Sequence, residues 1–317
     1  MKASLSLDLD NKWSYLKTHG DAGWRAMPSY LDKVVPLALD MLERLGQRIT
    51  FFIVGQDAAM PQHAEVFSEI PRRGHEVGNH SHYHEPWMHR RGENAIEDEL
   101  ARAEESIEAA TGIRPRGFRG PGFVRSMGIL ETLVRRGYLY DASSLPTFIG
   151  PLARAYYFRS TKLPREEAAR RHDLFGNFSD GLRPNRPHTI ETPSGPIVEV
   201  PVTTFPVFRV PIHISYVLYL AGVSPKAAVA YFRAALAACR LTFTQPSILL
   251  HPLDFISAAE APELAFFPAM QMDGDVKRNV VFESLSLLGK SFEVSPLIEA
   301  LPPRKFSLRP AEGPGVP

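Results

Sequence analysis

The segment "KASLSLDLDN", residues 2–11, decides the fold, because an apolar run suited to a buried strand leads straight into two aspartates. Residues i and i+2 of a strand point to the same side, so Asp8 and Asp10 would face one another and repel unless a cation lies between them. A metal ion, a phosphate-handling site or a plain solvated turn would each account for this arrangement.

Beyond this segment, short apolar runs alternate with helical patterns along the chain. Predicted strands lie at residues 3–7, 48–55, 75–80, 116–120, 138–141, 196–202 and 247–251, and predicted helices at residues 30–46, 64–74, 93–112, 126–137, 224–239 and 280–289. Strands that alternate with helices predict an α/β fold with a largely parallel sheet and helices outside it, either open or closed into a barrel.

Composition excludes several classes of protein. The 317 residues carry 36 Lys+Arg and 35 Asp+Glu, so the net charge of +1 gives no electrostatic case for binding nucleic acid. The single cysteine, Cys239, excludes an intrachain disulfide and a metal-thiolate cluster. No apolar run reaches the roughly 18 to 20 residues of a membrane span, and Asp8 interrupts what could have been a signal peptide. We therefore expect a soluble, cytoplasmic protein.

The domain organisation is expected to be simple. Residues 1–301 are predicted to form one catalytic domain, and residues 302–317 a proline-rich, poorly ordered tail. Within the domain, residues 150–195 lose the alternation and interleave aromatic with basic side chains. Such an insertion could cover the site as a lid, contact a membrane surface beside a lipid-linked sugar, or simply pack on the barrel as a helix with a basic face.

Ionisable residues stand at the ends of the predicted strands, where folds of this class gather their chemistry. They are Asp8, Asp10, His80, Arg119, Asp141 and His251. The segment "GHEVGNHSHYHEPW" adds a second histidine, His84, four residues after His80, a spacing that lets two imidazoles on one side of a helical turn bind one metal. A carboxylate from Asp8 or Asp10 would complete a site of two histidines and one carboxylate.

An aspartate pair with this spacing also occurs in two unrelated kinds of site. A calcium loop of the EF-hand type is excluded here, because its glycine and glutamate positions hold Trp13 and His19. An aspartyl phosphatase of the haloacid dehalogenase type also begins with D-x-D after its first strand, with Asp8 as nucleophile. This second possibility stays open, although Lys12 stands where that family has Thr or Ser.

Five motifs in order, "SLDLD", "GHEVGNHSHYH", "FRGPGF", "YDASS" and "ILLHP", resemble the polysaccharide deacetylases, carbohydrate esterase family 4. The resemblance spans roughly residues 5 to 252. It implies a distorted (β/α) barrel of about seven parallel strands. Two motifs depart from the common pattern: Leu9 separates aspartates that are adjacent in many members, and no Trp follows Asp141.

The resemblance also implies roles for individual residues. Asp10, His80 and His84 would bind a divalent metal, usually zinc. Asp8 would be the general base, Arg119 would tether that base, and His251 would be the general acid. Asp141 would orient the acid, with Asp254, three residues after His251, as its competitor for that role.

The implied activity is metal-dependent hydrolysis of an N-acyl group, with acetyl expected, from an amino sugar in a glycan or glycolipid. A small non-peptide amide, such as a formamide or cyclic ureide, is the alternative substrate for the same site. A D-x-D phosphatase and a catalytically silent glycan-binding protein are further alternatives. His75, in contrast, is expected to be a hydrogen-bonded core residue rather than a ligand.

Overall fold

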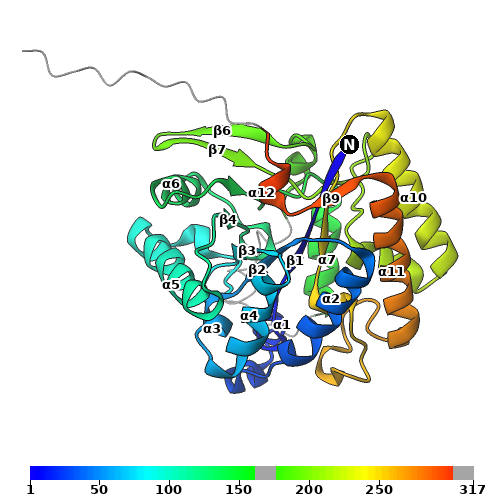
Figure 1. The fold of residues 1–317 in the computed structure, drawn as a ribbon, viewed down its shortest axis with the longest axis horizontal. Helices are drawn as coiled ribbons and strands as arrows, with labels where there is room; N and C mark the ends of the chain where they lie inside the picture. Colours follow the sequence, from blue (N-terminus) through cyan, green and yellow to red (C-terminus); the bar gives the residue numbers. More distant parts are fainter. Residues whose placement is uncertain (161–175, 303–317) are drawn as a thin grey trace, which may run out of the picture.

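The computed structural model describes residues 1–160 and 176–302, and these form one α/β unit with helices around a sheet (Figure 1). The strands are β1 (Lys2–Asp8), β2 (Thr50–Ile53), β3 (Glu76–Asn79), β4 (Gly117–Phe118), β5 (Tyr140–Asp141), β6 (His188–Thr192), β7 (Gly195–Glu199), β8 (Ser247–Leu250) and β9 (Glu293–Ser295). The helices are α1 (Lys12–His19), α2 (Leu31–Leu45), α3 (Gly55–Ala58), α4 (Ala64–Arg72), α5 (Glu93–Thr111), α6 (Met127–Arg135), α7 (Gly150–Ser160), α9 (Ile214–Ala221), α10 (Pro225–Leu241), α11 (Gly274–Ser291) and α12 (Leu297–Ala300).

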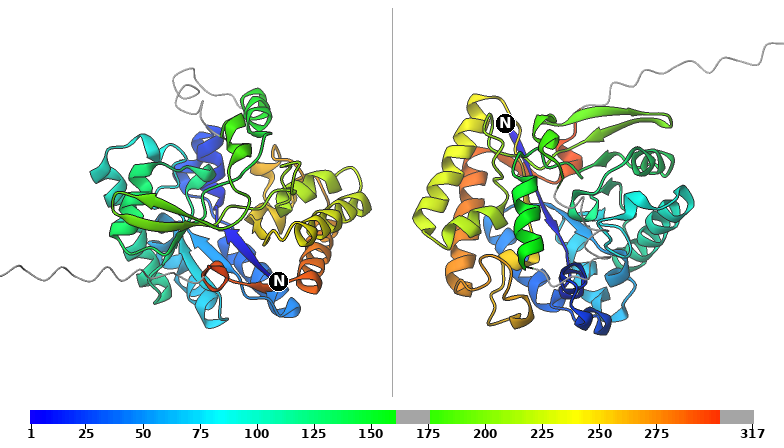
Figure 2. Two further views of the ribbon diagram at one scale, coloured as in Figure 1. Left: turned by 90° about the horizontal axis from the view of Figure 1, so that it is seen from above. Right: turned by 180° about the vertical axis from the view of Figure 1, so that it is seen from behind.

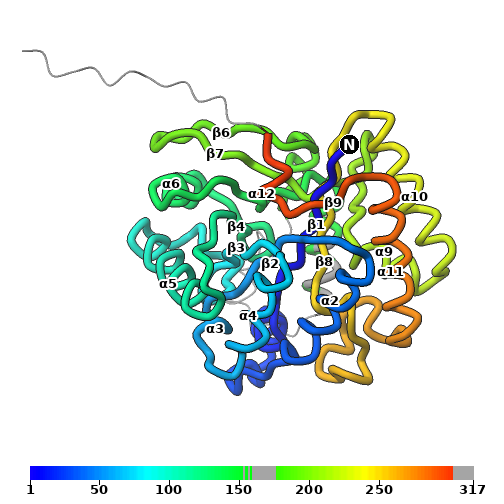
Figure 3. Tube along the Cα trace, viewed as in Figure 1, coloured from blue at the N-terminus to red at the C-terminus, as the bar shows by residue number. Residues whose placement is uncertain are grey.

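The sheet confirms the predicted α/β class. Its strand order is β6-β7-β5-β4-β3-β2-β1-β8, β9 also pairs with β1, and every pairing is parallel except β6 with β7. Figure 3 traces β1 through the middle of the molecule, and its neighbours in the sheet are β2 and β8. Every side chain of β2 is buried, as expected for a parallel strand covered on both faces.

The expected barrel is not closed. After β7 the chain runs irregularly, and Pro201 has no N–H to donate to a neighbouring strand. Two hydrogen bonds link this stretch to β8: Thr203 N–H donates to the Ser247 carbonyl, and Ser247 N–H donates to the Thr203 hydroxyl, each at 2.8 Å. The described strands therefore form an open sheet whose outer strands, β6 and β8, are not paired with one another. The expected count of seven parallel strands is not confirmed.

Several helix ends follow the predicted local signals. Gly112 ends α5 in the left-handed conformation at φ 73°, which favours glycine. The Ser126 hydroxyl caps α6 by accepting from Ile129 N–H, and Ser224 caps α10 ahead of Pro225. Figure 2 shows α10 and α11, in yellow and orange, on the opposite side of the molecule from α5, in cyan.

Two faces of the sheet carry different cores. Phe118 at the outer face packs with residues of α5 and α6, among them Leu100 and Ile129. Phe52 and Tyr140 point to the inner face and pack with Leu297 of α12. This inner cluster fills the interior below the carboxyl ends of the strands.

Two predicted segments fall partly or wholly outside the described residues. Of the 150–195 insertion, the structure describes α7, a 3-10 helix at Phe178–Leu182 and the start of the β6–β7 hairpin, whereas 161–175 lie outside. The predicted tail lies outside from residue 303 onward. The lid, membrane and packing alternatives for the insertion therefore remain predictions. Among the described residues, no helix has the length and apolar character needed to cross a membrane.

Candidate active site

The ionisable residues expected at strand ends are found there. Asp8 ends β1, Asp141 ends β5, and His80, Arg119 and His251 directly follow β3, β4 and β8. The carboxyl ends of the parallel strands meet at one edge of the sheet, so this part of the prediction is confirmed.

Strand register divides these residues between the two faces of the sheet. Asp8 pairs with Phe52 of β2, and His251 follows Leu250, the partner of Leu7, so it is level with Asp8. Alternate residues point to opposite faces. On β4 and β5, Phe118 pairs with Asp141 and both face outward, whereas Arg119, one residue later, faces inward.

Three side chains converge on one point inside this edge. The Asp10 Oδ1 atom lies 3.0 Å from His80 Nε2 and 2.8 Å from His84 Nε2, and all three residues are buried. Their donor atoms lie within 4.8 Å of one another. Two imidazole nitrogens and one carboxylate oxygen are the donor set of open zinc sites, so the residues fit a divalent metal. Asp10, rather than Asp8, contacts both histidines.

The histidines are held by an irregular turn and not by the helical turn expected from their spacing. Ser81 and His84 have positive φ angles of 62° and 50°, a conformation that non-glycine residues rarely adopt. The Asn79 side chain accepts from Ser81 N–H at 2.8 Å. Glu99 Oε1 accepts from the backbone N–H groups that precede His84, those of His82 and Tyr83. The turn is thus fixed from both sides, as is common where backbone strain serves a site.

A backbone hydrogen bond sets the orientation of His80. Its Nδ1 donates to the Arg119 carbonyl at 2.7 Å, which leaves the Nε2 lone pair directed toward Asp10. Burial alone would lower the pKa of His80, but the nearby Asp8 and Asp10 carboxylates raise it overall. Burial would raise the pKa of Asp10, yet His84 and His80 bring it well below its usual value. The site therefore stabilises an ionised carboxylate among buried imidazoles.

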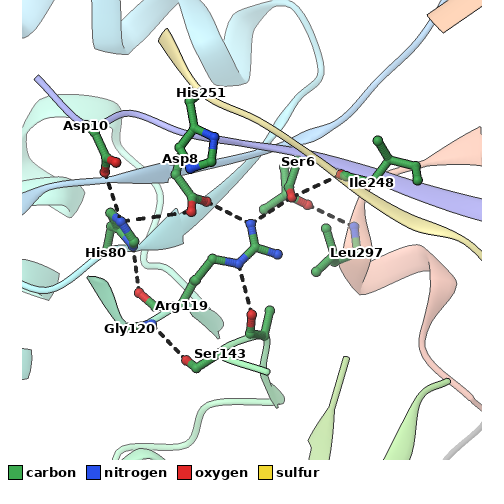
Figure 4. Close-up of polar contacts among 12 residues, drawn as sticks. Ser6, Asp8, Asp10, His80, Arg119, Gly120, Ser143, Ile248, His251 and Leu297 are labelled. Atoms are coloured by element: carbon green, nitrogen blue, oxygen red, sulfur yellow. Dashed lines mark hydrogen bonds and ion pairs between the residues drawn. The ribbon is translucent and has the colours of Figure 1, made fainter. Parts of the chain in front are cut away.

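Asp8 lies beside this cluster and is paired with an arginine (Figure 4). Its Oδ1 accepts from Arg119 Nη1 at 2.7 Å, and its Oδ2 lies 4.0 Å from His80 Nε2. Arg119 is fully buried, and its guanidinium also donates to the Ser6 hydroxyl and to the Ala142 carbonyl. The guanidinium carbon lies 4.4 Å from the centre of the inward-facing Phe52 ring. One oxygen of Asp8 is therefore held, and the other faces the histidine cluster.

His251 is half-buried and anchored by two contacts. Its ring Nδ1 lies 3.0 Å from the Ser215 hydroxyl of α9, and its backbone N–H donates to Asp254 Oδ2 at 2.8 Å. Asp254, at the end of the 3-10 helix η6 (Pro252–Asp254), is buried. The sequence points to Asp254 as a possible orienter but not to Ser215, which lies in an apolar segment without a motif.

Asp141 lies on the outer face of the sheet and not on the inner face with His251, the residue that it was expected to orient. Its Oδ1 accepts from the Ser143 hydroxyl at 2.5 Å, and Ser143 Oγ accepts from Gly120 N–H at 2.7 Å. Asp141 pairs in the sheet with Glu199, which accepts from Arg125 Nη1 at 3.1 Å. These contacts hold the backbone after Arg119. An orienting contact to His251 is not among the contacts of the described residues, so that role stays a prediction without geometric support.

A buried carboxyl that sequence reasoning missed supports the metal-site segment from behind. Asp57 Oδ1 accepts from Asn11 Nδ2 at 2.7 Å and from Trp13 Nε1 at 2.8 Å. Both donors belong to the segment that directly follows Asp10 in the chain. Burial raises the pKa of Asp57 to about 7. The signal in the sequence that could have revealed Asp57 is its position soon after β2, in the segment "VGQDAA".

His75 is a core residue, as expected: its Nδ1 accepts from Ile49 N–H at 3.2 Å, and burial lowers its pKa to about 4.

Comparisons with known proteins agree with the resemblance expected from the motifs. Residues 21–140 match the polysaccharide deacetylase family model. The uncharacterized protein YlxY of Bacillus subtilis (strain 168) is 32% identical over 92 residues, which is 29% of this chain and 27% of that protein. The match therefore spans little more than a quarter of the curated relative.

The fold is shared with a solved structure. A candidate polysaccharide deacetylase from Mycobacterium smegmatis superposes with a TM-score of 0.61 and 19% identity over 96% of this chain and 93% of that chain. A family 4 carbohydrate esterase from Streptomyces lividans, solved in complex with acetate, has a TM-score of 0.46 and 16% identity over 93% of this chain and 91% of that chain. The ordered motifs, the family match and the shared fold agree: residues 21–140 of this chain match the polysaccharide deacetylase family, and the chain shares the fold of the mycobacterial structure.

Proposed function

We propose that the protein is a zinc-dependent hydrolase that removes an N-acetyl group from an amino sugar of a glycan or glycolipid. One observation carries the proposal: Asp10, His80 and His84 converge beside an arginine-paired Asp8, with His251 level with Asp8 on the next strand. Asp8, Asp10 and His251 lie outside the matched range 21–140, so their roles rest on this geometry and on the motif resemblance.

The base in this proposal is Asp8. A divalent metal bound by Asp10, His80 and His84 would lower the pKa of a water molecule and polarise the acyl carbonyl. Asp8 Oδ2 faces the cluster and takes the proton of the attacking water. Its other oxygen is fixed by Arg119, which holds the carboxylate in this orientation.

The acid in this proposal is His251. When the C–N bond breaks, the amine has to leave with a proton, and an imidazole is the side chain suited to donate it near neutral pH. The ring is held through Nδ1 by Ser215, so Nε2 is the nitrogen left to meet the leaving group. Base and acid thus come from neighbouring strands, β1 and β8.

A row of rings on α9 favours a sugar over a small amide. The His213 ring lies 6.3 Å from His251, Tyr216 lies 6.2 Å from His213, and Tyr219 lies 6.3 Å from Tyr216. Tyr219 is 55% exposed, so the row leads from the proposed acid to the surface. Aromatic rings present flat apolar faces on which sugar rings can pack. A small amide would have no use for such a row.

The test is an acetate and formate release assay over a panel of N-acyl amino sugars, glycolipids, formamides and cyclic ureides. Metal-stripped and zinc-reloaded protein are compared, with Asp8→Asn alongside. We expect acetate from sugars, lost on chelation, restored by zinc and reduced at least about 10²-fold in Asp8→Asn. Activity that ignores chelation or survives Asp8→Asn unchanged would contradict the mechanism. Release only from small amides would reassign the substrate, and phosphate release from phosphate esters would favour the phosphatase alternative.

A further inference from the structure

Asp57 is a buried carboxyl that the proposed reaction does not use, and its side-chain hydrogen bonds go to the segment that follows Asp10. The residue is fully buried on the short helix α3, where its Oδ1 accepts from Asn11 Nδ2 and from Trp13 Nε1. Its Oδ2 is buried too and has no hydrogen-bond partner among the described residues. One oxygen of Asp57 therefore holds two side chains of a single stretch of chain.

The first of these side chains, the Asn11 amide, is completely hydrogen-bonded. Its Nδ2 donates to the Ser29 hydroxyl at 3.0 Å as well as to the buried carboxyl. Its Oδ1 accepts from Lys12 N–H at 2.8 Å and from Tyr30 N–H at 3.3 Å. An asparagine amide offers two donor hydrogens and two acceptor lone pairs, so its full capacity is used. Because Asp10 directly precedes Asn11, fixing this amide also fixes the backbone from which the Asp10 carboxylate projects.

The second side chain, the Trp13 indole, lies against another of the metal-site residues. Its ring is edge-on to the His84 imidazole, with 6.5 Å between the ring centres and 82° between the ring planes. The indole has a single N–H, and this group donates to Asp57 at 2.8 Å. The hydrogen bond therefore sets how the indole is turned, and the indole in turn limits where the His84 ring can lie.

The helix that carries Asp57 also contacts the turn between the two histidines. Gly55 N–H donates to the Ser81 carbonyl at 2.9 Å, and Gln56 N–H donates to the His82 carbonyl at 3.0 Å. A Cβ atom at position 55 would lie 2.7 Å from His82 Nδ1, so glycine allows this close approach. One short helix thus contacts both segments that supply the metal-site residues, the stretch after β1 and the turn after β3.

We propose that Asp57 is a positioning residue for the metal centre, because its two hydrogen bonds join the Asp10 segment to the histidine turn across α3. This inference rests on the metal site of the proposed function and does not depend on the substrate. Asp57 itself is not one of the three residues whose donor atoms converge. Side chains held in place before a metal arrives lose less conformational freedom on binding, so the metal binds more tightly.

The test compares zinc affinity among full-length variants, measured by competition with a chromophoric chelator. Asp57→Leu keeps a branched side chain but removes both acceptors, and we expect its zinc dissociation constant to rise by about 10-fold or more. Asp57→Asn keeps an oxygen that can accept from both donors, so its dissociation constant should stay within about twofold of the wild type. Equal weakening in the two variants would show that the charge of Asp57, and not its hydrogen bonds, acts on the metal. That result would overturn the proposal.

A second readout is the visible absorption spectrum of the cobalt-loaded protein, which depends on the arrangement of ligands around the ion. We expect the spectra of the wild type and Asp57→Asn to coincide and that of Asp57→Leu to differ. If Asp57→Leu kept both the spectrum and the zinc affinity of the wild type, Asp57 would have no positioning role.

A matched control is Glu76→Leu, which removes another carboxyl that accepts from two side chains, the hydroxyls of Thr50 and Tyr140. Glu76 begins β3, the strand whose other end leads into His80. We expect Glu76→Leu to lower the free energy of unfolding in urea but to leave the zinc dissociation constant within about twofold of the wild type. Comparable weakening of zinc binding in Glu76→Leu and Asp57→Leu would indicate a general effect of lost stability and contradict the proposal.

If Asp57→Leu does not fold, Trp13→Phe removes one of the two hydrogen bonds and keeps an aromatic ring beside His84. Its zinc dissociation constant should rise by about fivefold or more, and an unchanged value would overturn the proposal. Wild-type protein that binds no zinc would refute the metal site and the proposed function with it. Equally tight binding by the wild type and Asp57→Leu would refute only the role of Asp57.

Discussion

Buried ionisable side chains occupy both faces of the sheet at the carboxyl ends of its parallel strands, and the two groups differ in how their charges are balanced. On the inner face, Asp8 is paired with Arg119, and Asp10 lies between two imidazoles. On the outer face, Asp141 and Glu199 are two neighbouring carboxyls that share Arg125.

The pKa values differ in the same way. Burial, adjacent Asp141 and their hydrogen bond raise the pKa of Glu199 well above its usual value, and burial also raises that of Asp141. On the inner face, the pKa of Asp10 is lowered instead. A buried carboxyl at a strand end is therefore not by itself evidence of catalysis. A site is distinguished from a structural contact by the face of the sheet on which the carboxyl lies and by the residue that pairs with its charge.

The largest effect is expected for Asp10→Asn. Losing the carboxylate removes one of three donors and leaves a neutral amide between His80 and His84, so metal affinity should fall by about 10²-fold or more. Zinc content after dialysis, measured by elemental analysis, and acetate release should fall together. If Asp10→Asn kept one zinc ion per chain, the assignment of the metal site to the inner face would be wrong.

The second largest effect is expected when each face loses its arginine. Arg119→Met leaves Asp8 buried without its partner, and we expect the free energy of unfolding in urea to fall by about 3–5 kcal/mol. Arg125→Met should cost only about 1 kcal/mol, because the outer carboxyl pair can hold a proton in place of the lost positive charge. Equal losses in the two variants would remove the distinction between the faces.

A smaller effect concerns the pH dependence of stability. The folded state keeps a proton on Glu199 above its ordinary pKa of about 4.5, where the unfolded chain has released it. The stability from this group is thus present at low pH and is lost as pH rises through the raised pKa. Between pH 5 and pH 8, the free energy of unfolding measured with urea should fall less for Glu199→Gln than for the wild type. Parallel profiles would show that the outer pair is ionised throughout.

The smallest effect on activity is expected for Asp141→Asn. The amide can still accept from Ser143, and the side chain faces away from His251. Zinc content should be unchanged, and kcat should stay within about threefold of the wild type in the acetate assay. A loss of about 10²-fold with the metal and the fold intact would restore the orienting role implied by the family resemblance.

Much of the fold and of the site follows from local sequence signals. Apolar runs locate the parallel strands, and caps such as Ser126 locate helix starts. Strand ends then supply the ionisable residues that the structure brings to one edge of the sheet. The division between faces does not follow, because β4 and β5 have two residues each, too few for alternation to reveal which way Asp141 points.

The remaining features depend on tertiary packing. The turn that joins His80 to His84 is fixed by Glu99, which belongs to α5. Ser215 meets His251 across 36 positions of sequence, from a helix whose pattern is apolar. Contacts of this kind leave no periodic signal, so the sequence alone does not reveal them.

Leu9, the residue between the two aspartates, has a consequence for how this chain can change over evolution. It is fully buried, and its N–H donates to the Phe52 carbonyl of β2 at 2.9 Å. One intervening residue is what places Asp8 and Asp10 on the same face. A different apolar side chain there alters only packing, whereas inserting or deleting one residue turns one carboxylate away from the site. This strand end should accept changes of residue type far more readily than changes of length.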